Sequence, residues 1–243
     1  MQSSNSTHSV LKKSPVEMLC VGEFSLKDAQ PSTLSKVVFL DKDGTLIENV
    51  PYNVDPQHIK LAPGAVSGLQ LLHRAGYKLF IITNQSGVAR GYFPETALTS
   101  LEDHLRSLLE SFDIPLSGFY YCPHHPDGVI PAYAIDCNCR KPQPGLFHQA
   151  AADYAIDLTQ SWFIGDILHD VEAGRSAGCR TILIDNGNET EWQLSVQRLP
   201  HHVVTDLHQA AQVILAIDQS VSTLESTPVT GSTCHEFRST PLN

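Results

Sequence analysis

The sequence has little positive charge and no long apolar run. Lysine and arginine together number 16, against 26 aspartate and glutamate residues, which gives a formal net charge of −10. An acidic surface repels a polyphosphate backbone, so we expect no nucleic-acid partner. No apolar run approaches the roughly 20 residues that cross a bilayer, and residues 1–19 lack the apolar segment of a secretory signal. These absences favour a cytoplasmic protein without a membrane partner.

The chain divides by composition into a middle region and two ends. Residues 1–34 are rich in Ser, Gln and Lys and show no sustained periodicity, so we expect a flexible N-terminal extension there. Residues 218–243 are dense in Ser and Thr, which predicts a disordered tail. The remaining residues, 35–217, are long enough to enclose a sizeable hydrophobic core. We expect them to form a single folded domain.

The middle region alternates between short apolar runs and helical patterns. Apolar runs rich in β-branched residues predict strands at 36–40, 78–83, 118–122, 161–165, 180–185 and 202–205. Apolar residues at helical spacing predict helices at 63–75, 94–112, 144–154 and from the fourth strand to 177, with one more after the last strand. This alternation predicts an α/β fold with a doubly wound, mostly parallel sheet. In such a fold, ligands bind beyond the carboxyl ends of the strands.

Two carboxylates follow the first predicted strand, in the motif DKDGT at residues 41–45. Asp41 can attack phosphorus, since a carboxylate needs no deprotonation at neutral pH. Asp43, two residues on, can give and take a proton at the leaving oxygen and at the attacking water. Asp and Gly are also common in turns, so the motif alone is equally compatible with a simple turn.

Three further polar motifs follow other predicted elements. TNQSG at 83–87 ends the second strand and offers a hydroxyl and backbone N–H groups to phosphate oxygens. Arg140 and Lys141 form a cation pair just before a helix. Asp166 and Asp170 stand four residues apart after the fourth strand, where both can face a divalent cation. Each motif alone is a weak signal, but their order along an alternating α/β chain indicates a site for phosphoryl chemistry.

The motifs DKDGT, ITN, RKP and GDILHD, in this order, resemble those of the haloacid dehalogenase superfamily over residues 36–190. The resemblance implies a Rossmann-like fold without a large cap domain, and a phosphatase that forms an aspartyl-phosphate. Asp41 matches the nucleophile and Asp43 the general acid/base. Thr83 and Lys141 match the residues that hold the transferring phosphoryl group. Asp41, the backbone carbonyl of Asp43, and Asp166 match the ligands of Mg²⁺, which is the implied cofactor.

Three of the six cysteines gather beside histidines in the loop after the third predicted strand. CPHHP at 122–126 and CNC at 137–139 form two compact pairs with the spacing of a structural zinc site. Cys122, Cys137 and Cys139 would supply three thiolates. We prefer His124 to His125 as the fourth ligand. His124 is separated from Cys122 by one residue, just as Cys139 is separated from Cys137 by one residue. A reduced, metal-free loop is the alternative. Zinc would fix the conformation of this loop, which is too long to be ordered by its own contacts, and would thereby position Arg140 and Lys141.

With this loop, the chain is similar to the group of D-glycero-D-manno-heptose 1,7-bisphosphate 7-phosphatases and histidinol-phosphate phosphatases. The shared stretches are DKDGTLIENVPYNVDP, TNQSGVARGYF and CNCRKPQPGLF. The resemblance implies a substrate entrance and a substrate loop formed by Asn49, Val50, Pro51, Tyr52, Asn84, Gln85 and Ser86. Arg140 offers a second cation for the remote phosphate of a bisphosphate, which favours the heptose enzyme. One residue departs from the pattern: heptose enzymes of the group carry Lys directly after the fourth-motif Asp, where this chain has Ile167.

We therefore predict that residues 35–217 form a Mg²⁺-dependent phosphatase domain that removes the 7-phosphate of a heptose bisphosphate. The expected partner is a small phosphorylated sugar, and the expected assembly is a monomer. The alternatives are a histidinol-phosphate phosphatase or another small phosphate esterase, and a non-catalytic binding protein on the same fold. A DNA-end phosphatase is disfavoured by the negative charge.

Overall fold

The structure, a computed structural model, describes residues 34–225. Within this range six parallel strands form one sheet in the order β3-β2-β1-β4-β5-β6. The strands are β1 (Val37–Leu40), β2 (Lys78–Asn84), β3 (Leu116–Cys122), β4 (Trp162–Gly165), β5 (Arg180–Ile184) and β6 (His202–Val204). The predicted parallel sheet is thereby confirmed.

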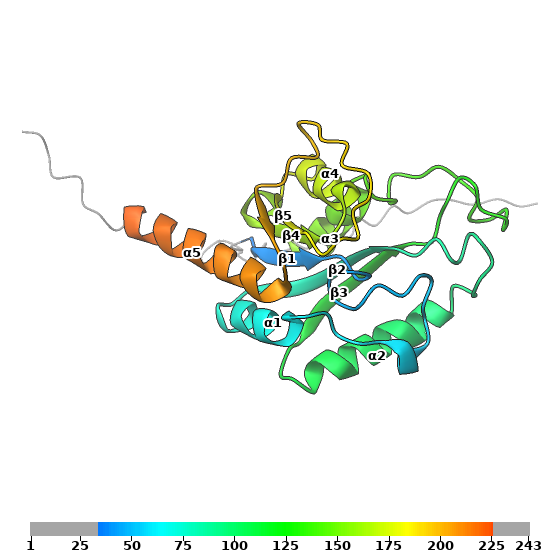
Figure 1. Ribbon diagram of the computed structural model, residues 1–243, viewed down its shortest axis with the longest axis horizontal. Coiled ribbons are helices and arrows are strands. Elements are labelled where there is room, and N and C mark those ends of the chain that lie inside the picture. Colours follow the sequence, from blue (N-terminus) through cyan, green and yellow to red (C-terminus); the bar gives the residue numbers. More distant parts are fainter. Residues whose placement is uncertain (1–33, 226–243) are drawn as a thin grey trace, which may run out of the picture. The chain divides into compact units, whose positions relative to one another are not determined.

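Helices cover both faces of the sheet (Figure 1). One face carries α1 (Ala65–Arg74), α2 (Ala97–Glu110) and α5 (Leu207–Glu225), and the other carries α3 (Gly145–Tyr154) and α4 (Leu168–Ser176). Two short 3-10 helices, η1 (Pro56–His58) and η2 (Leu158–Gln160), lie in the connections. The arrangement is the expected doubly wound α/β fold. No helix within residues 34–225 combines the length and the apolar character that crossing a membrane requires.

Alternate residues of each strand serve the two faces, as the two-residue period of a strand requires. In β1, Val38 and Leu40 enter the core shared with α1 and α5, whereas Val37 and Phe39 enter the core shared with α3. All four are fully buried, which explains why this strand reads as an unbroken apolar run. Phe39 contacts Phe147 of α3 edge-on, with ring centroids 5.1 Å apart.

The strand order reverses at β1, which lies between β2 and β4. Leu40 of β1 is in register with Ile81 of β2 and Ile164 of β4. The next residue, Asp41, donates its backbone N–H to the carbonyl of Ile164 at 2.9 Å. The ends of three strands therefore meet at one edge of the sheet. Such a reversal point is where ligands bind in open α/β sheets.

Two element boundaries differ by more than two residues from the expected ones. Helix α2 begins at Ala97 rather than at Pro94, because residues 94–97 first form a turn in which Ala97 N–H donates to the Pro94 carbonyl. The tail expected from residue 218 is instead helical as far as Glu225. Its first residue, Asp218, accepts hydrogen bonds from Tyr77 Oη at 2.7 Å and Lys36 Nζ at 2.5 Å, which anchor α5 to the domain. The rest of the expected extension and tail, 1–33 and 226–243, lies outside the described residues.

Candidate active site

The first motif forms a tight turn directly after β1. Asp41, the first residue of the turn, is buried. Asp43 follows two residues later, and both side chains line the same cavity. Gly44 adopts φ +83°, and a Cβ atom there would lie 2.0 Å from Oδ2 of Asp166. Only glycine therefore lets this turn approach the end of β4 so closely.

A donor holds each oxygen of the Asp43 carboxylate. Lys42 Nζ lies 2.5 Å from Oδ1, and Gln85 Nε2 donates to Oδ2 at 3.1 Å. The same Gln85 amide donates to Thr83 Oγ1 at 3.0 Å, so one side chain links the acid to a hydroxyl of β2. Burial raises the pKa of Asp43 above its ordinary value, although the Lys42 ammonium opposes the shift. A raised pKa suits a group that must carry a proton to a leaving oxygen.

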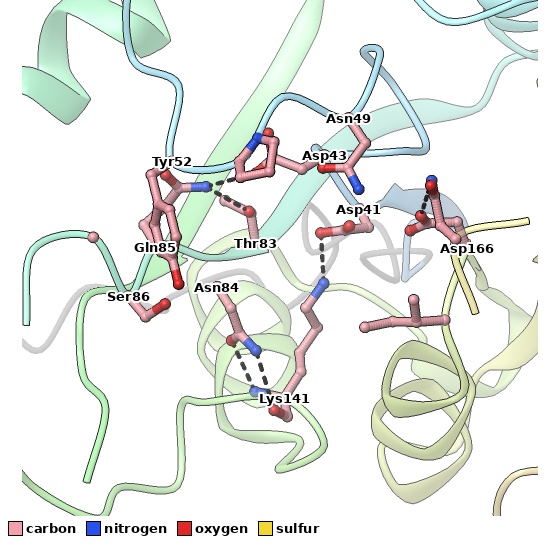
Figure 2. Close-up of a pocket in the computed structure, with 14 residues that line it drawn as sticks. Asp41, Asp43, Asn49, Tyr52, Thr83, Asn84, Gln85, Ser86, Lys141 and Asp166 are labelled. Atoms are coloured by element: carbon pink, nitrogen blue, oxygen red, sulfur yellow. Dashed lines mark hydrogen bonds and ion pairs between the residues drawn. The ribbon is translucent and has the colours of Figure 1, made fainter. Parts of the chain in front are cut away.

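Lys141 provides the cation at the centre of the site. Its side chain is buried, and Nζ lies 2.6 Å from Asp41 Oδ1 and 2.7 Å from Asp170 Oδ1. Burial lowers the pKa of Lys141, but the two carboxylates outweigh burial and raise it above the ordinary value. Asn84, predicted to contact substrate, also clamps the lysine backbone, since its side chain accepts from Lys141 N at 3.0 Å and donates to the Lys141 carbonyl at 3.1 Å (Figure 2).

Three carboxylates converge beside this lysine. Ligand oxygens of Asp41, Asp166 and Asp170 lie within 4.8 Å of one another, and all three residues are buried. Burial, followed by repulsion from the other two carboxylates, raises the pKa of Asp166 to about 8. One ammonium group cannot neutralise three carboxylates. A buried set of oxygen donors with surplus negative charge fits a divalent cation such as Mg²⁺.

A cavity of about 390 Å³ opens over these groups. The predicted site residues that line it, drawn in Figure 2, are Asp41, Asp43, Asn49, Tyr52, Thr83, Asn84, Gln85, Ser86, Lys141 and Asp166. Tyr52 stands at its exposed rim, and its ring packs edge-on against Tyr92 with centroids 4.6 Å apart. The volume lies in the range of pockets that bind small metabolites.

Arg140 lies outside this cavity. It lines a neighbouring one of about 270 Å³, whose wall also includes Lys141. Arg140 Nη1 lies 3.4 Å from the backbone carbonyl oxygen of His124. The two adjacent cations therefore point in different directions, and the part of Arg140 in recognising a second phosphate stays a prediction.

A second cluster of possible metal ligands lies at the end of β3 and in the loop between β3 and α3, and consists of Cys122, His124, Cys137 and Cys139. The three sulfur atoms are 3.1, 3.2 and 3.5 Å apart, and His124 Nδ1 lies 3.3 Å from the nearest sulfur. All three cysteines are free thiols. His125 instead contacts Arg90 through Nε2 at 3.0 Å, which keeps it out of the cluster. Three sulfur atoms and one imidazole nitrogen, gathered this closely, fit a tetrahedral zinc ion.

Sequence patterns did not indicate two residues of the site. Asn188 lines the cavity and donates to Asp166 Oδ2 at 2.8 Å, yet its loop carries no motif. Its one sequence signal is its position shortly after the carboxyl end of β5. Lys42 stands between the two motif acids, but the spacing alone could not show that its ammonium is buried against Asp43. Asp170, expected to face a divalent cation beside Asp166, belongs to the carboxylate cluster and forms an ion pair with the Lys141 ammonium.

Known proteins resemble the chain over the region that carries this site. A family model described as HAD-hydrolase-like matches residues 138–210. The chain is 38% identical over 156 residues to D-glycero-alpha-D-manno-heptose-1,7-bisphosphate 7-phosphatase of Photorhabdus laumondii subsp. laumondii, covering 64% of this chain and 85% of that protein. It is 40% identical over 155 residues to D-glycero-beta-D-manno-heptose-1,7-bisphosphate 7-phosphatase of Haemophilus influenzae, covering 63% and 84%. The crystal structure of D,D-heptose 1,7-bisphosphate phosphatase from B. bronchiseptica, with magnesium and phosphate, matches with a TM-score of 0.65 and 32% identity, covering 75% of this chain and 99% of that one.

Proposed function

This chain belongs to the heptose-1,7-bisphosphate 7-phosphatase family of haloacid dehalogenase-like hydrolases, and we propose that its substrate is D-glycero-D-manno-heptose 1,7-bisphosphate, from which it removes the 7-phosphate. It is a phosphoric monoester hydrolase. The relatives' names specify the alpha anomer in one case and the beta anomer in another, so the proposal covers the bisphosphate without choosing between anomers.

In the proposed reaction Asp41 is the nucleophile. Its carboxylate oxygen bonds to phosphorus, the bond between phosphorus and the sugar oxygen breaks, and Asp43 gives that oxygen a proton. Asp43 then takes a proton from the water that hydrolyses the aspartyl-phosphate, which releases inorganic phosphate and restores Asp41. Lys141 and Thr83 hold the oxygens of the phosphoryl group throughout.

The observation that carries this proposal is the place of Lys141. Its buried ammonium contacts Asp41 at 2.6 Å on the wall of the cavity, and Asp43 faces the same cavity with both oxygens held by donors. Phosphoryl transfer depends mainly on positioning and on neutralising phosphoryl oxygens. A nucleophile, a proton donor and a cation around one small cavity meet those needs.

Two metal ions complete the proposal. Mg²⁺ would be held by the carboxylates of Asp41 and Asp166 and by the Asp43 carbonyl, and when bound it would neutralise charge on the phosphoryl oxygens. Zn²⁺ would occupy the cysteine–histidine cluster, where four protein ligands leave no position for substrate, so its part is structural. By fixing the loop that leads into Lys141, zinc would position that lysine. We further propose that the enzyme acts as a monomer in the cytoplasm, as the sequence analysis predicts.

A phosphate-release screen tests the substrate assignment. Heptose 1,7-bisphosphate, heptose 7-phosphate, fructose 1,6-bisphosphate and histidinol phosphate are compared in MgCl₂, with Asp41→Asn as the inactive control. We expect the highest kcat/KM for the heptose bisphosphate. A higher value for histidinol phosphate would move the enzyme to that activity, and no release from any of the four would favour a binding protein on the same fold.

A further inference from the structure

The loop between β5 and β6 reaches back to the fourth motif. Asn188 of this loop donates its side-chain amide to Asp166 Oδ2 at 2.8 Å, and the two residues line the same cavity. The other oxygen of this carboxylate, Oδ1, accepts a longer hydrogen bond of 3.3 Å from Thr45 Oγ1. Among the described residues, the shorter of the two hydrogen bonds to the Asp166 carboxylate therefore comes from a loop outside all four motifs.

The same loop contacts both metal-binding motifs at further points. Asn186 Nδ2 donates to the Gly44 carbonyl at 2.7 Å, and Glu189 Oε2 accepts from the backbone N–H of Leu168, the first residue of α4, at 2.7 Å. A Cβ atom on Gly44 would lie 2.5 Å from Asn188 Nδ2, so the turn and the loop are in direct contact. Three residues of the segment 186–189 thus connect the turn that follows β1 with the residues that follow β4.

We propose that Asn188 is a positioning residue of the magnesium site, and that its amide holds the Asp166 carboxylate in the orientation that the cation requires. This inference rests on the proposed Mg²⁺-dependent function. Each carboxylate oxygen has two lone-pair positions, so one amide hydrogen bond still leaves Oδ2 able to bind a cation. An uncharged amide fixes the carboxylate without neutralising it.

The charges around the site explain why an amide suits this place. The ion pairs of Lys141 go to Asp41 and Asp170, at 2.6 and 2.7 Å. Asp166 is buried at 3% exposure, so water alone does not orient it. A second lysine beside it would compete with the divalent cation. Partners that orient metal ligands in this way commonly contribute tenfold or more to metal affinity.

The test is a titration of the full-length chain with MgCl₂ alone, read by calorimetry and by the rise in Tm. Asn188→Ala should raise the half-saturating Mg²⁺ concentration by about ten- to a hundredfold. Asn188→Leu, which fills a similar volume without a hydrogen-bond donor, should raise the half-saturating Mg²⁺ concentration by a similar factor. Thr190→Ala, an exposed change in the same loop, is the matched control and should leave the Mg²⁺ titration unchanged. Raising MgCl₂ by the measured factor should restore phosphatase activity in Asn188→Ala.

A purely structural part for Asn188 gives a different result. In that case both variants would melt at lower temperature without Mg²⁺ but would bind Mg²⁺ as tightly as the wild type, and the inference would be overturned. Retention of affinity by Asn188→Leu alone would also overturn it, because volume rather than the hydrogen bond would then matter. If the wild-type chain binds no Mg²⁺, the proposed cofactor itself is refuted. That outcome is distinguishable from the two outcomes above, in which the wild type binds Mg²⁺.

Discussion

Replacing Lys141 with methionine tests the charge balance on which the site depends. The side chain is buried at 4% exposure and its ammonium pairs with Asp41 and Asp170. Methionine fills a similar volume but has no charge, so Lys141→Met leaves the three clustered carboxylates without the cation between them. These carboxylates then repel one another in a site that water screens poorly.

The magnitude follows from the burial of the pair. Removing one partner of a buried ion pair costs about 3–5 kcal/mol, because the other partner is left uncompensated. At about 2–4 °C per kcal/mol for a domain of this size, Tm should fall by about 6–20 °C in buffer without Mg²⁺. Asp170→Asn is the matched control: it keeps the contact between Lys141 and Asp41, so its loss of Tm should be smaller.

Thermal melting with and without MgCl₂ is the assay. Mg²⁺ should narrow the difference in Tm between Lys141→Met and the wild type, since a divalent cation replaces the missing charge. Activity should stay lost, because the reacting phosphate no longer meets the lysine. If Lys141→Met melts within about 2 °C of the wild type without Mg²⁺, less than the shift expected for 1 kcal/mol, the carboxylates are not held by this lysine and the reasoning fails.

Three other changes probe separate parts of the site. Asp41→Asn should abolish phosphate release, because an amide is not a nucleophile. A cooperative melting transition without Mg²⁺ should show that the variant is still folded. A steady-state rate near that of the wild type would exclude Asp41 as the nucleophile. Metal analysis should find about one zinc per chain, as the four-ligand cluster predicts, and Cys137→Ser should lower both the zinc content and the stability. Zinc-free protein from zinc-replete cells would contradict the site. Arg140→Ala should lower kcat/KM for a heptose bisphosphate by about ten- to a hundredfold through a lost hydrogen bond to the remote phosphate, and much less for a monophosphate. Equal losses on the two substrates, with zinc content unchanged, would show that Arg140 does not bind the second phosphate.

The fold could be predicted because its signals are local. Strands buried on both faces, such as β1, appear in the sequence as unbroken apolar runs. Helices appear as apolar residues that recur at helical spacing. The resemblance of the polar motifs to a known family then predicted which residues share one site. Asp41, Thr83, Lys141 and Asp166 come from four separate segments, and the structure brings all four to one cavity.

The remaining features depend on contacts that no local pattern encodes. Asn188 follows a strand without any motif around it, and its contact with Asp166 exists only because the loop folds back across the sheet edge. Whether Arg140 faces the cavity depends on how the loop bends around the cysteine cluster, and the structure directs it toward the carbonyl of His124. Helix α5 continues beyond residue 218, and there Asp218 accepts hydrogen bonds from Tyr77 and Lys36, which are distant in the sequence.

Phosphorus NMR of heptose 1,7-bisphosphate during turnover tests the central claim most directly. In the presence of Mg²⁺ and the wild-type chain, the 7-phosphate signal should disappear as inorganic phosphate appears, while the 1-phosphate signal remains. The Asp41→Asn protein should leave both signals intact over the same period. Loss of the 1-phosphate instead, or a spectrum that does not change with the wild-type chain, would contradict the proposed function.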